Sequence, residues 1–175
     1  MNLKAKIREI PDWPKPGVNF KDITTLLEDR QAFCQVIDRL AQPFIGQPID
    51  KVVGIDARGF LLAAPVAYKL RAGLAIVRKK GKLPSRTIAQ EYTLEYASNI
   101  IEMHEDSIKP GENVILIDDL CATGGTALAA CDLIAKLGGH IVALNFLIDL
   151  PFLGGSKKIK DRGYQVRTLI EYDSE

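Results

Sequence analysis

Two adjacent carboxylates, Asp118 and Asp119, follow a short aliphatic run and precede a loop of small residues from Cys121 to Thr126. Carboxylate oxygens accept hydrogen bonds, which suits a vicinal diol such as the 2′- and 3′-hydroxyls of a ribose. Two adjacent glycines in the loop have no Cβ, so an anion can approach the main chain closely. Backbone N–H groups of such a loop and of the following helix form an anion site, and two threonines add hydroxyl donors. Diol acceptors beside phosphate donors predict a site for a ribose 5-phosphate.

The same residues could instead form only the polar end of a strand–turn–helix junction. We favour a ligand site because two adjacent acids that end a hydrophobic strand are costly unless a ligand uses them. The aliphatic run Val114–Ile117 is typical of a buried strand in a parallel sheet. Ligands bind at the carboxyl ends of such strands. The chain has neither GxxxxGK[ST] nor a GxGxxG that opens a helix, so it lacks the commoner nucleotide-binding loops.

Basic residues mark two further segments. Arg58 lies between a predicted strand and a predicted helix, where its guanidinium and nearby N–H groups could share a phosphate. A salt bridge to Asp56 in the same loop is the alternative. The run Arg78–Arg86 is rich in lysine and arginine, and such a run is often a solvated loop. At the same sheet edge as two anion loops, it is better interpreted as counter-charge for a polyphosphate, and its lack of interleaved aromatics argues against a nucleic-acid site.

The stretch VILIDDLCATGGT, residues 114–126, resembles the 5-phosphoribosyl-1-pyrophosphate signature of the type I phosphoribosyltransferases. The chain is similar to the adenine-specific members of that family over nearly its whole length. The resemblance implies transfer of the 5-phosphoribosyl group from 5-phosphoribosyl-1-pyrophosphate to N9 of adenine, which yields AMP and pyrophosphate in purine salvage. It also implies a homodimer and Mg²⁺. We expect the ion to bind mainly through substrate and water, because octahedral Mg²⁺ retains waters and no carboxylate cage is apparent in the sequence.

The resemblance assigns roles to residues around the sugar. Asp118 and Asp119 are expected to hold the ribose hydroxyls. The expected 5′-phosphate loop consists of Ala122, Thr123, Gly124, Gly125 and Thr126. The expected pyrophosphate contacts are Asp56, Ala57, Arg58, Lys79 and Lys82, of which Arg58 is also expected to be catalytic. In the family, the lysines are partly contributed across a dimer interface, and the loop before Arg58 often contains a non-proline cis peptide.

The base-recognition loop of the same enzymes resembles residues 16–22 of this chain. Phe20 is expected to stack on the purine, while main-chain groups of Asn19 and Lys21 read its edge. Stacking a base on an aromatic ring contributes about 1–3 kcal/mol. A core phenylalanine beneath a proline-rich loop is the alternative.

Glu95 and Tyr96 correspond to the mobile loop that closes over the substrates in the family. Closure would exclude water, which competes with the base for the activated sugar. The resemblance makes Glu95 the expected proton acceptor or carrier at the purine. On residue type alone it would be a glutamate on an exposed hairpin.

Strands and helices are predicted to alternate from residue 51 onward. This pattern predicts an α/β fold with a mostly parallel sheet and helices on both faces. The expected strands are 51–56, 74–78, 113–118, 140–149 and 164–170, and the expected helices are 1–10, 29–44, 60–70 and 126–137. Residues 79–105 break the alternation and predict a basic loop and a projecting hairpin, which the resemblance makes a mobile lid. The resemblance also implies that residues 1–30 form a base-recognising arm, or hood, on a single domain that spans 1–175.

Bulk properties favour a globular domain in the cytoplasm. The chain has 175 residues, of which 47% are hydrophobic and 26% charged. A net charge of +1 gives no global electrostatic case for nucleic acid or membrane. The first residues are not a secretory signal and no apolar stretch is long enough to span a bilayer. Three cysteines without Cys-x-x-Cys spacing predict free thiols in a reducing compartment.

Two alternatives stay open at this point. The first is a phosphoribosyltransferase for another base, such as hypoxanthine, guanine, xanthine or orotate, although the loop at residues 19–21 favours adenine. The second is a non-catalytic regulator that senses the sugar donor and binds RNA or DNA. The net charge and the absence of a helix-turn-helix segment before the sheet disfavour the regulator.

Overall fold

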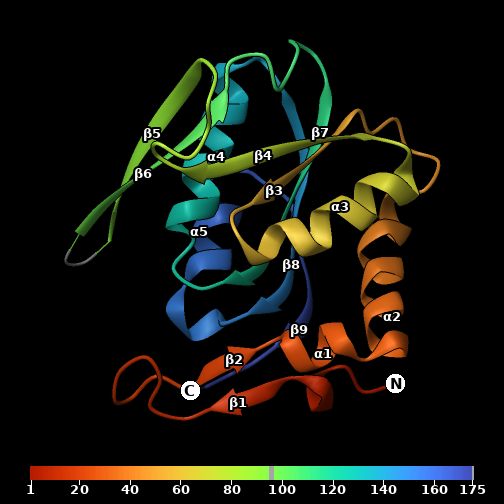
Figure 1. Ribbon diagram of the computed structural model, residues 1–175, viewed down its shortest axis with the longest axis vertical. Helices are drawn as coiled ribbons and strands as arrows, with labels where there is room; N and C mark the ends of the chain where they lie inside the picture. Colours follow the sequence, from red (N-terminus) through yellow and green to blue (C-terminus); the bar gives the residue numbers. More distant parts are fainter. Residues whose placement is uncertain (95–96, 175) are drawn as a thin grey trace.

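The computed structural model describes residues 1–94 and 97–174, and its core is a seven-stranded sheet (Figure 1). The strand order is β5-β6-β4-β3-β7-β8-β9, and the run from β4 to β9 is parallel. The strands are β3 (Lys51–Ile55), β4 (Gly73–Lys79), β5 (Thr87–Leu94), β6 (Ala97–His104), β7 (Asn113–Cys121), β8 (His140–Asp149) and β9 (Val166–Glu171). The predicted α/β fold is confirmed.

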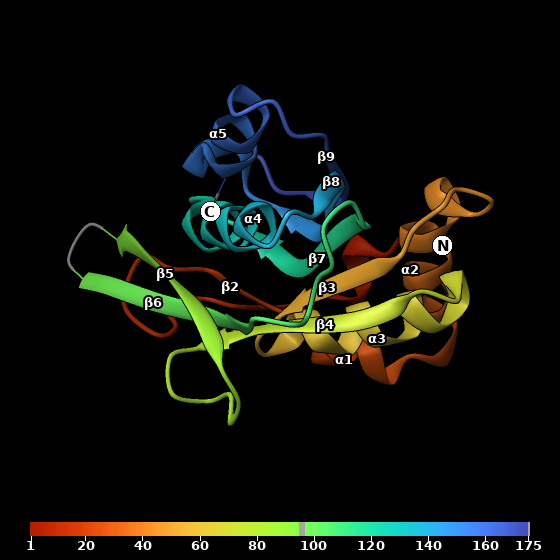
Figure 2. The same cartoon turned by 90° about the horizontal axis from the view of Figure 1, so that it is seen from above.

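Helices cover both faces of the sheet (Figure 2). The helices are α1 (Thr24–Glu28), α2 (Arg30–Ala41), α3 (Arg58–Leu70), α4 (Gly125–Lys136) and α5 (Gly155–Asp161). One buried cluster joins the sheet to α2 and α3, and a second joins the opposite face to α4 and α5. The aliphatic run that opens β7 is fully buried between these clusters, which is why this strand carries no polar alternation until its end.

The antiparallel hairpin β5–β6 projects from the edge of the sheet, as predicted (Figure 1). It joins the sheet through a short antiparallel pairing of β6 with the end of β4. Its inner side contacts α4, where Lys136 Nζ donates a hydrogen bond to Gln90 Oε1 at 2.7 Å. Within the described residues, no helix is both long and apolar enough to cross a bilayer.

The predicted N-terminal helix is wrong. The chain there forms a short 3-10 helix (Lys4–Lys6) and then β1 (Arg8–Ile10), which pairs with β2 (Phe20–Asp22) in a separate two-stranded ribbon. Leu3 and Ile7 are indeed buried, but they anchor an extended segment on the core. Pairing with a strand distant in sequence overrides the helical spacing, since local pattern is a weak determinant in so short a segment.

β7 is also longer than predicted. Its pairing with β3 ends at Ile117, but its pairing with β8 continues through Asp118 to Cys121. The two aspartates therefore lie within the strand, at the point where β3 has left the sheet. This one-sided pairing leaves the β3 side of the aspartates open.

Candidate active site

β3 and β7 lie side by side but lead to helices on opposite faces of the sheet. α3 follows β3 and packs in one buried cluster, whereas α4 follows β7 and packs in the other. Such a divergence of adjacent parallel strands creates a crevice at their carboxyl ends, which is where open α/β sheets bind ligands. The predicted site residues of both loops lie around this crevice.

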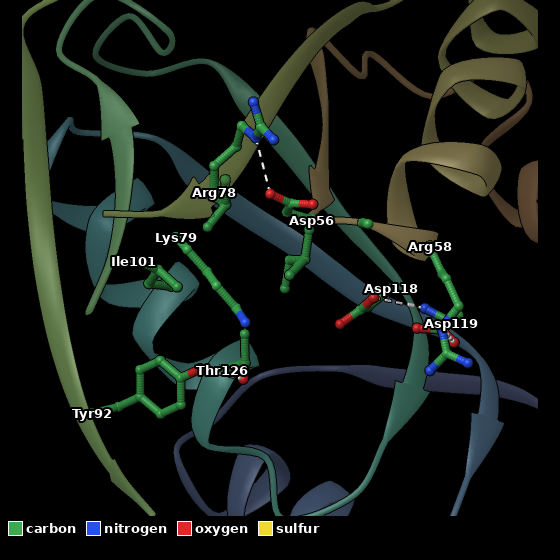
Figure 3. A pocket seen from close by; sticks show the side chains of 12 residues that line it. Asp56, Arg58, Arg78, Lys79, Tyr92, Ile101, Asp118, Asp119 and Thr126 are labelled. Atoms are coloured by element: carbon green, nitrogen blue, oxygen red, sulfur yellow. Dashed lines mark hydrogen bonds and ion pairs between the residues drawn. The ribbon is translucent and has the colours of Figure 1, made fainter. Parts of the chain in front are cut away.

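A cavity of about 280 Å³ occupies the crevice (Figure 3). Its lining comes from the ends of β3, β4 and β7, from the hairpin and from the first turns of α3 and α4. The lining residues are Ile55, Asp56, Ala57, Arg58, Val77, Arg78, Lys79, Tyr92, Ile101, Asp118, Asp119 and Thr126. The structure thus brings predicted diol, phosphate and pyrophosphate residues from four segments into one cavity.

The two aspartates have different surroundings. Asp119 is buried, and its Oδ2 lies 2.8 Å from Arg58 Nε in an ion pair. Its backbone N–H donates a hydrogen bond to Asp118 Oδ1 at 2.9 Å. Burial, and then the charge of Asp119, raise the pKa of Asp118 well above its usual range. Asp118 is therefore the carboxylate without an ion-pair partner among the described residues, whereas Asp119 has Arg58, although its Oδ2 accepts no hydrogen bond there.

Gly59 sets the distance between α3 and β7. A Cβ at this position would lie 2.8 Å from Asp118 Oδ1 and 3.1 Å from the carbonyl oxygen of Ile117. Any side chain would push the helix away from the strand or displace the Asp118 carboxylate. Sequence reasoning missed Gly59, although its place next to Arg58 at a helix start is a signal of close packing.

The predicted phosphate loop encloses a second cavity of about 90 Å³, lined by all five residues from Ala122 to Thr126. Gly124 has φ of +82°, which a residue with a side chain rarely adopts, and it precedes the first turn of α4. Asp118 and Thr126 line both this cavity and the larger one. The predicted diol and phosphate positions are therefore contiguous.

Tyr92, on the hairpin, contacts the phosphate loop. The Thr126 hydroxyl and the Tyr92 hydroxyl form a hydrogen bond of 3.0 Å, and the Tyr92 ring covers Gly125. Tyr92 also lines the larger cavity (Figure 3). This contact joins residues 34 positions apart, so no local pattern could have predicted it.

A third cavity, of about 380 Å³, shares Thr123 and Gly125 with the phosphate loop. Its apolar wall includes Phe152 and Leu153, two large side chains that are otherwise exposed. They lie in a 3-10 helix (Pro151–Leu153) directly after β8. Sequence reasoning did not identify this wall.

The cationic side of the site is held by ion pairs and by a structured loop. Arg78 Nε pairs with Asp56 Oδ2 at 2.9 Å, so the alternative of an Arg58–Asp56 salt bridge is wrong. The peptide bond between Asp56 and Ala57 is cis, as the resemblance implies. Lys79 lines the cavity of about 280 Å³, whereas Lys82 is exposed and is not among the residues that line this cavity.

Buried Glu102 shapes the loop after β4. Its Oε1 accepts hydrogen bonds from the backbone N–H groups of Gly81 at 3.0 Å and Leu83 at 3.2 Å. Its Oε2 lies 3.3 Å from the Thr87 hydroxyl. These bonds fix the course of the basic loop on either side of Lys82.

The predicted base-recognition residues lie at the start of β2, which Asn19 directly precedes and in which Phe20 and Lys21 are the first two residues. Phe20 meets Arg58, whose Cζ lies 5.1 Å from the ring centroid, and it also meets Trp13 in an edge-to-face contact at 4.5 Å. Asn19 Nδ2 donates to Glu9 at 2.6 Å. The Lys21 side chain is buried, and its Nζ lies 4.3 Å from the centre of the Tyr172 ring. Arg58 thus connects the aromatic ring expected at the base with the aspartate pair expected at the sugar.

Glu95 and Tyr96 lie outside the described residues. In the part of the chain that is described, no group of three or more His, Cys, Asp or Glu side chains could hold a metal ion.

Comparisons with known proteins identify the family of this chain. The family model of the phosphoribosyl transferase domain matches residues 24–173. An adenine phosphoribosyltransferase of Rhodopseudomonas palustris (strain BisB18) is 56% identical over 172 residues, 98% of this chain and 86% of the relative. One from Marinobacter nauticus is 51% identical over 174 residues, 99% of this chain and 97% of the relative.

Solved structures give the same result. A crystal structure of adenine phosphoribosyltransferase from Rhodothermus marinus has a TM-score of 0.92 and 46% identity, covering 97% of this chain and 96% of that one. The Saccharomyces cerevisiae enzyme, complexed with an imino-altritol bisphosphate and adenine, has a TM-score of 0.89 and 36% identity, covering 95% and 96%. The chain belongs to the phosphoribosyltransferase family and, within it, to the adenine phosphoribosyltransferases. The family predicted from the sequence is confirmed.

Proposed function

We propose that this protein transfers the 5-phosphoribosyl group from 5-phosphoribosyl-1-pyrophosphate to adenine, which yields AMP and pyrophosphate in purine salvage. The observation that carries this proposal is the shared wall between two cavities. Asp118 and Thr126 line both the loop cavity suited to a phosphate and the cavity of about 280 Å³, whose lining includes arginine and lysine side chains. A single substrate that carries a phosphate, a diol and a pyrophosphate fits this arrangement of a phosphate loop, an aspartate pair and basic side chains.

The sugar is held at the end of β7. Backbone N–H groups and hydroxyls of Ala122–Thr126 bind the 5′-phosphate. Asp118 accepts hydrogen bonds from the ribose hydroxyls, and Asp119 supports it from the neighbouring position. Hydroxyl donors favour the ionised form of Asp118, which offsets the burial and the like charge that raise its pKa.

The pyrophosphate lies toward Arg58 and Lys79, with Asp56, Ala57 and Lys82 completing its surroundings. Bond breaking at the anomeric carbon passes through an oxocarbenium-like state, as in other glycosyl transfers. The protein then acts mainly through position and electrostatics. Arg58 lies between Asp119 and Phe20, so it stands where the leaving pyrophosphate and the incoming base exchange.

The residues fit a magnesium ion that substrate oxygens and waters largely hold. Asp118 offers a carboxylate that makes no ion pair among the described residues, but there is no cluster of three ligating side chains in that part of the chain. Mg²⁺ prefers such partial protein ligation and, when bound, neutralises charge on the pyrophosphate.

The base lies against Phe20, with main-chain groups of Asn19 and Lys21 at its edge. Residues 1–30 form this base-recognising arm, and residues 79–105 form the lid, within a single domain. Glu95 handles the proton at the purine and Tyr96 closes over the substrates. Phe152 and Leu153 add an apolar wall beside the phosphate loop.

We also propose that the protein acts in the cytoplasm as a homodimer without nucleic-acid or membrane partners. The net charge of +1 supports the absence of such partners. Sedimentation at micromolar concentration tests the proposed dimer. A protein that stays monomeric at every concentration measured would contradict it.

The activity is tested by incubating the protein with Mg²⁺, radiolabelled sugar donor and separate bases. The expected product is AMP from adenine, with little product from hypoxanthine, guanine, xanthine or orotate. Turnover of a 6-oxopurine but not of adenine would favour the other-base alternative. Tight, salt-sensitive nucleic-acid binding without AMP formation would favour the regulator.

A further inference from the structure

The β1–β2 ribbon that carries Phe20 is not part of the main sheet. Each of its strands has three residues, and an isolated two-stranded ribbon of this kind is at best marginally stable. Its orientation must therefore come from contacts with the rest of the protein. The C-terminal end of the described chain lies beside it (Figure 1).

Lys21 makes the central contact. Only 6% of this residue is exposed, and its Nζ donates a hydrogen bond to Glu9 Oε2 at 2.7 Å across the ribbon. The same Nζ lies 4.3 Å from the centre of the Tyr172 ring, within the range of a cation–π contact. A buried ammonium needs such partners, because burial without them is costly. Lys21 is thus fastened to Tyr172, which follows β9.

Tyr172 is itself fixed to the body of the protein. It is 5% exposed, and its backbone N–H donates to the carbonyl oxygen of Asp149 at the end of β8. Lys4 Nζ lies 4.1 Å from the ring and donates a hydrogen bond to the carbonyl oxygen of Glu171 at 2.8 Å. The Tyr172 hydroxyl has no hydrogen-bond partner among the described residues. The ring, rather than the hydroxyl, therefore makes the connection.

Strand geometry carries this connection to the site. Successive side chains of a strand point to opposite faces, so Lys21 points inward while Phe20 points the other way. Phe20 is there in contact with Arg58 and Trp13. Fixing Lys21 in the interior thus sets the direction of the neighbouring aromatic ring toward the site.

We propose that Tyr172 is a positioning residue for base recognition, which acts through its ring contact with Lys21 to hold Phe20 beside Arg58. This rests on the proposed function in one respect, that adenine lies against Phe20. Tyr172 lines none of the three cavities of the candidate site. Its loss should weaken adenine binding without altering the sugar site.

The first experiment compares Tyr172→Leu with the conservative Tyr172→Phe. The leucine variant should raise KM for adenine about tenfold, which corresponds to about 1.4 kcal/mol and lies within the range of cation–π contacts, with kcat and KM for the sugar donor within about twofold of wild type. The phenylalanine variant retains the ring and should behave as wild type. The same Tyr-to-Leu change at exposed Tyr68, on α3, is the matched control and should have no effect. Equal increases in both KM values, or a phenylalanine variant as impaired as the leucine variant, would overturn the proposal.

A second readout needs no catalysis. Trp13 is the only tryptophan of the chain and packs on Phe20, so its fluorescence reports the position of the arm directly. Tyr172→Leu should shift Trp13 emission and increase its quenching by acrylamide, whereas Tyr172→Phe should not. Unchanged emission in a folded leucine variant would overturn the proposal. If wild type forms no AMP, the proposed function fails while this readout still decides the role of Tyr172.

Lys21→Met provides a second test of the proposal in case Tyr172→Leu does not fold. It keeps Tyr172 and most of the buried side chain but removes the cation. The same selective rise in KM for adenine and the same Trp13 shift are expected. Wild-type values for both measurements would overturn the proposal.

Discussion

The proposed sugar-phosphate site and the proposed base arm are built by different means. The sugar-phosphate site comes from one continuous stretch, in which a buried strand, two aspartates, a glycine loop and a helix start follow one another. The base arm is a short ribbon that owes its position to a lysine–tyrosine contact spanning most of the chain. Backbone pairing within the main sheet positions the first region, whereas side-chain contacts position the second. We therefore expect substitutions in the first to lower turnover strongly and those in the second to change affinity selectively.

The largest effect is expected at Asp118. Asp118→Asn removes a charged acceptor of the ribose hydroxyls, worth about 2–3 kcal/mol, so kcat/KM should fall about 100-fold. Steady-state AMP formation measures this loss. Asp119→Asn is the matched comparison, because it breaks the ion pair with Arg58 instead.

Asp118→Asn and Asp119→Asn should change the free energy of unfolding in opposite directions. The pKa of Asp118 is raised in the folded protein, so stability falls as pH rises between its unfolded value and that raised value. Asp118→Asn removes this loss and should stabilise the ligand-free protein near neutral pH. Asp119→Asn should destabilise it, since Arg58 loses its partner. Urea unfolding from about pH 5 to about pH 8 tests both signs, and destabilisation by Asp118→Asn would contradict the raised pKa.

Gly59→Ala tests whether the site depends on the approach of α3 to β7. The added Cβ would lie 2.8 Å from Asp118 Oδ1, so we expect a loss of about 1–3 kcal/mol of stability and a large fall in kcat. Leu61→Ala, at an exposed position of the same helix, is the control and should change neither. Thermal unfolding and AMP formation measure the two effects, and wild-type activity of Gly59→Ala would show that the approach is not needed.

A smaller effect is expected at Glu102, which shapes the basic loop. Glu102→Ala removes the acceptor of two backbone N–H groups and should raise KM for the sugar donor about tenfold, with KM for adenine little changed. Glu105→Ala removes only an exposed ion pair with Arg86 and should have no effect. A rise confined to KM for adenine would contradict the assignment of this loop to the pyrophosphate.

The smallest effect concerns the acid limb of the pH profile. The limb of kcat/KM reports groups of the free enzyme, and ionisation of Asp118 is required. Because the charge of Asp119 helps to raise the pKa of Asp118, Asp119→Asn should move the Asp118 limb to lower pH. An unchanged or higher limb would contradict this coupling.

The difference between the two regions also explains what the sequence could predict. The alternation of strands and helices and the strand–loop–helix stretch are local patterns. They therefore predict the sheet, its flanking helices and the placement of Asp118 beside the loop Ala122–Thr126. The carboxyl ends of β3 and β7 meet because of the sheet order, and this places Arg58 beside Asp119. The pairing of Arg58 with Asp119 could not be predicted from the segment around either residue alone.

The remaining features depend on long-range contacts or on short elements. Tyr92, Glu102 and Tyr172 act through partners far away in the sequence, so no spacing identifies them. The helices α1 and α5 are too short to show a clear period. The N-terminal strand was mistaken for a helix because its partner lies ten or more residues further on.

A crystal structure with AMP tests the central claim most directly. We predict the phosphate in the cavity formed by Ala122–Thr126, the ribose hydroxyls at Asp118 and the adenine against Phe20. A phosphate held instead by Arg58 and Lys79, with the loop cavity empty or filled by protein side chains, would contradict the account.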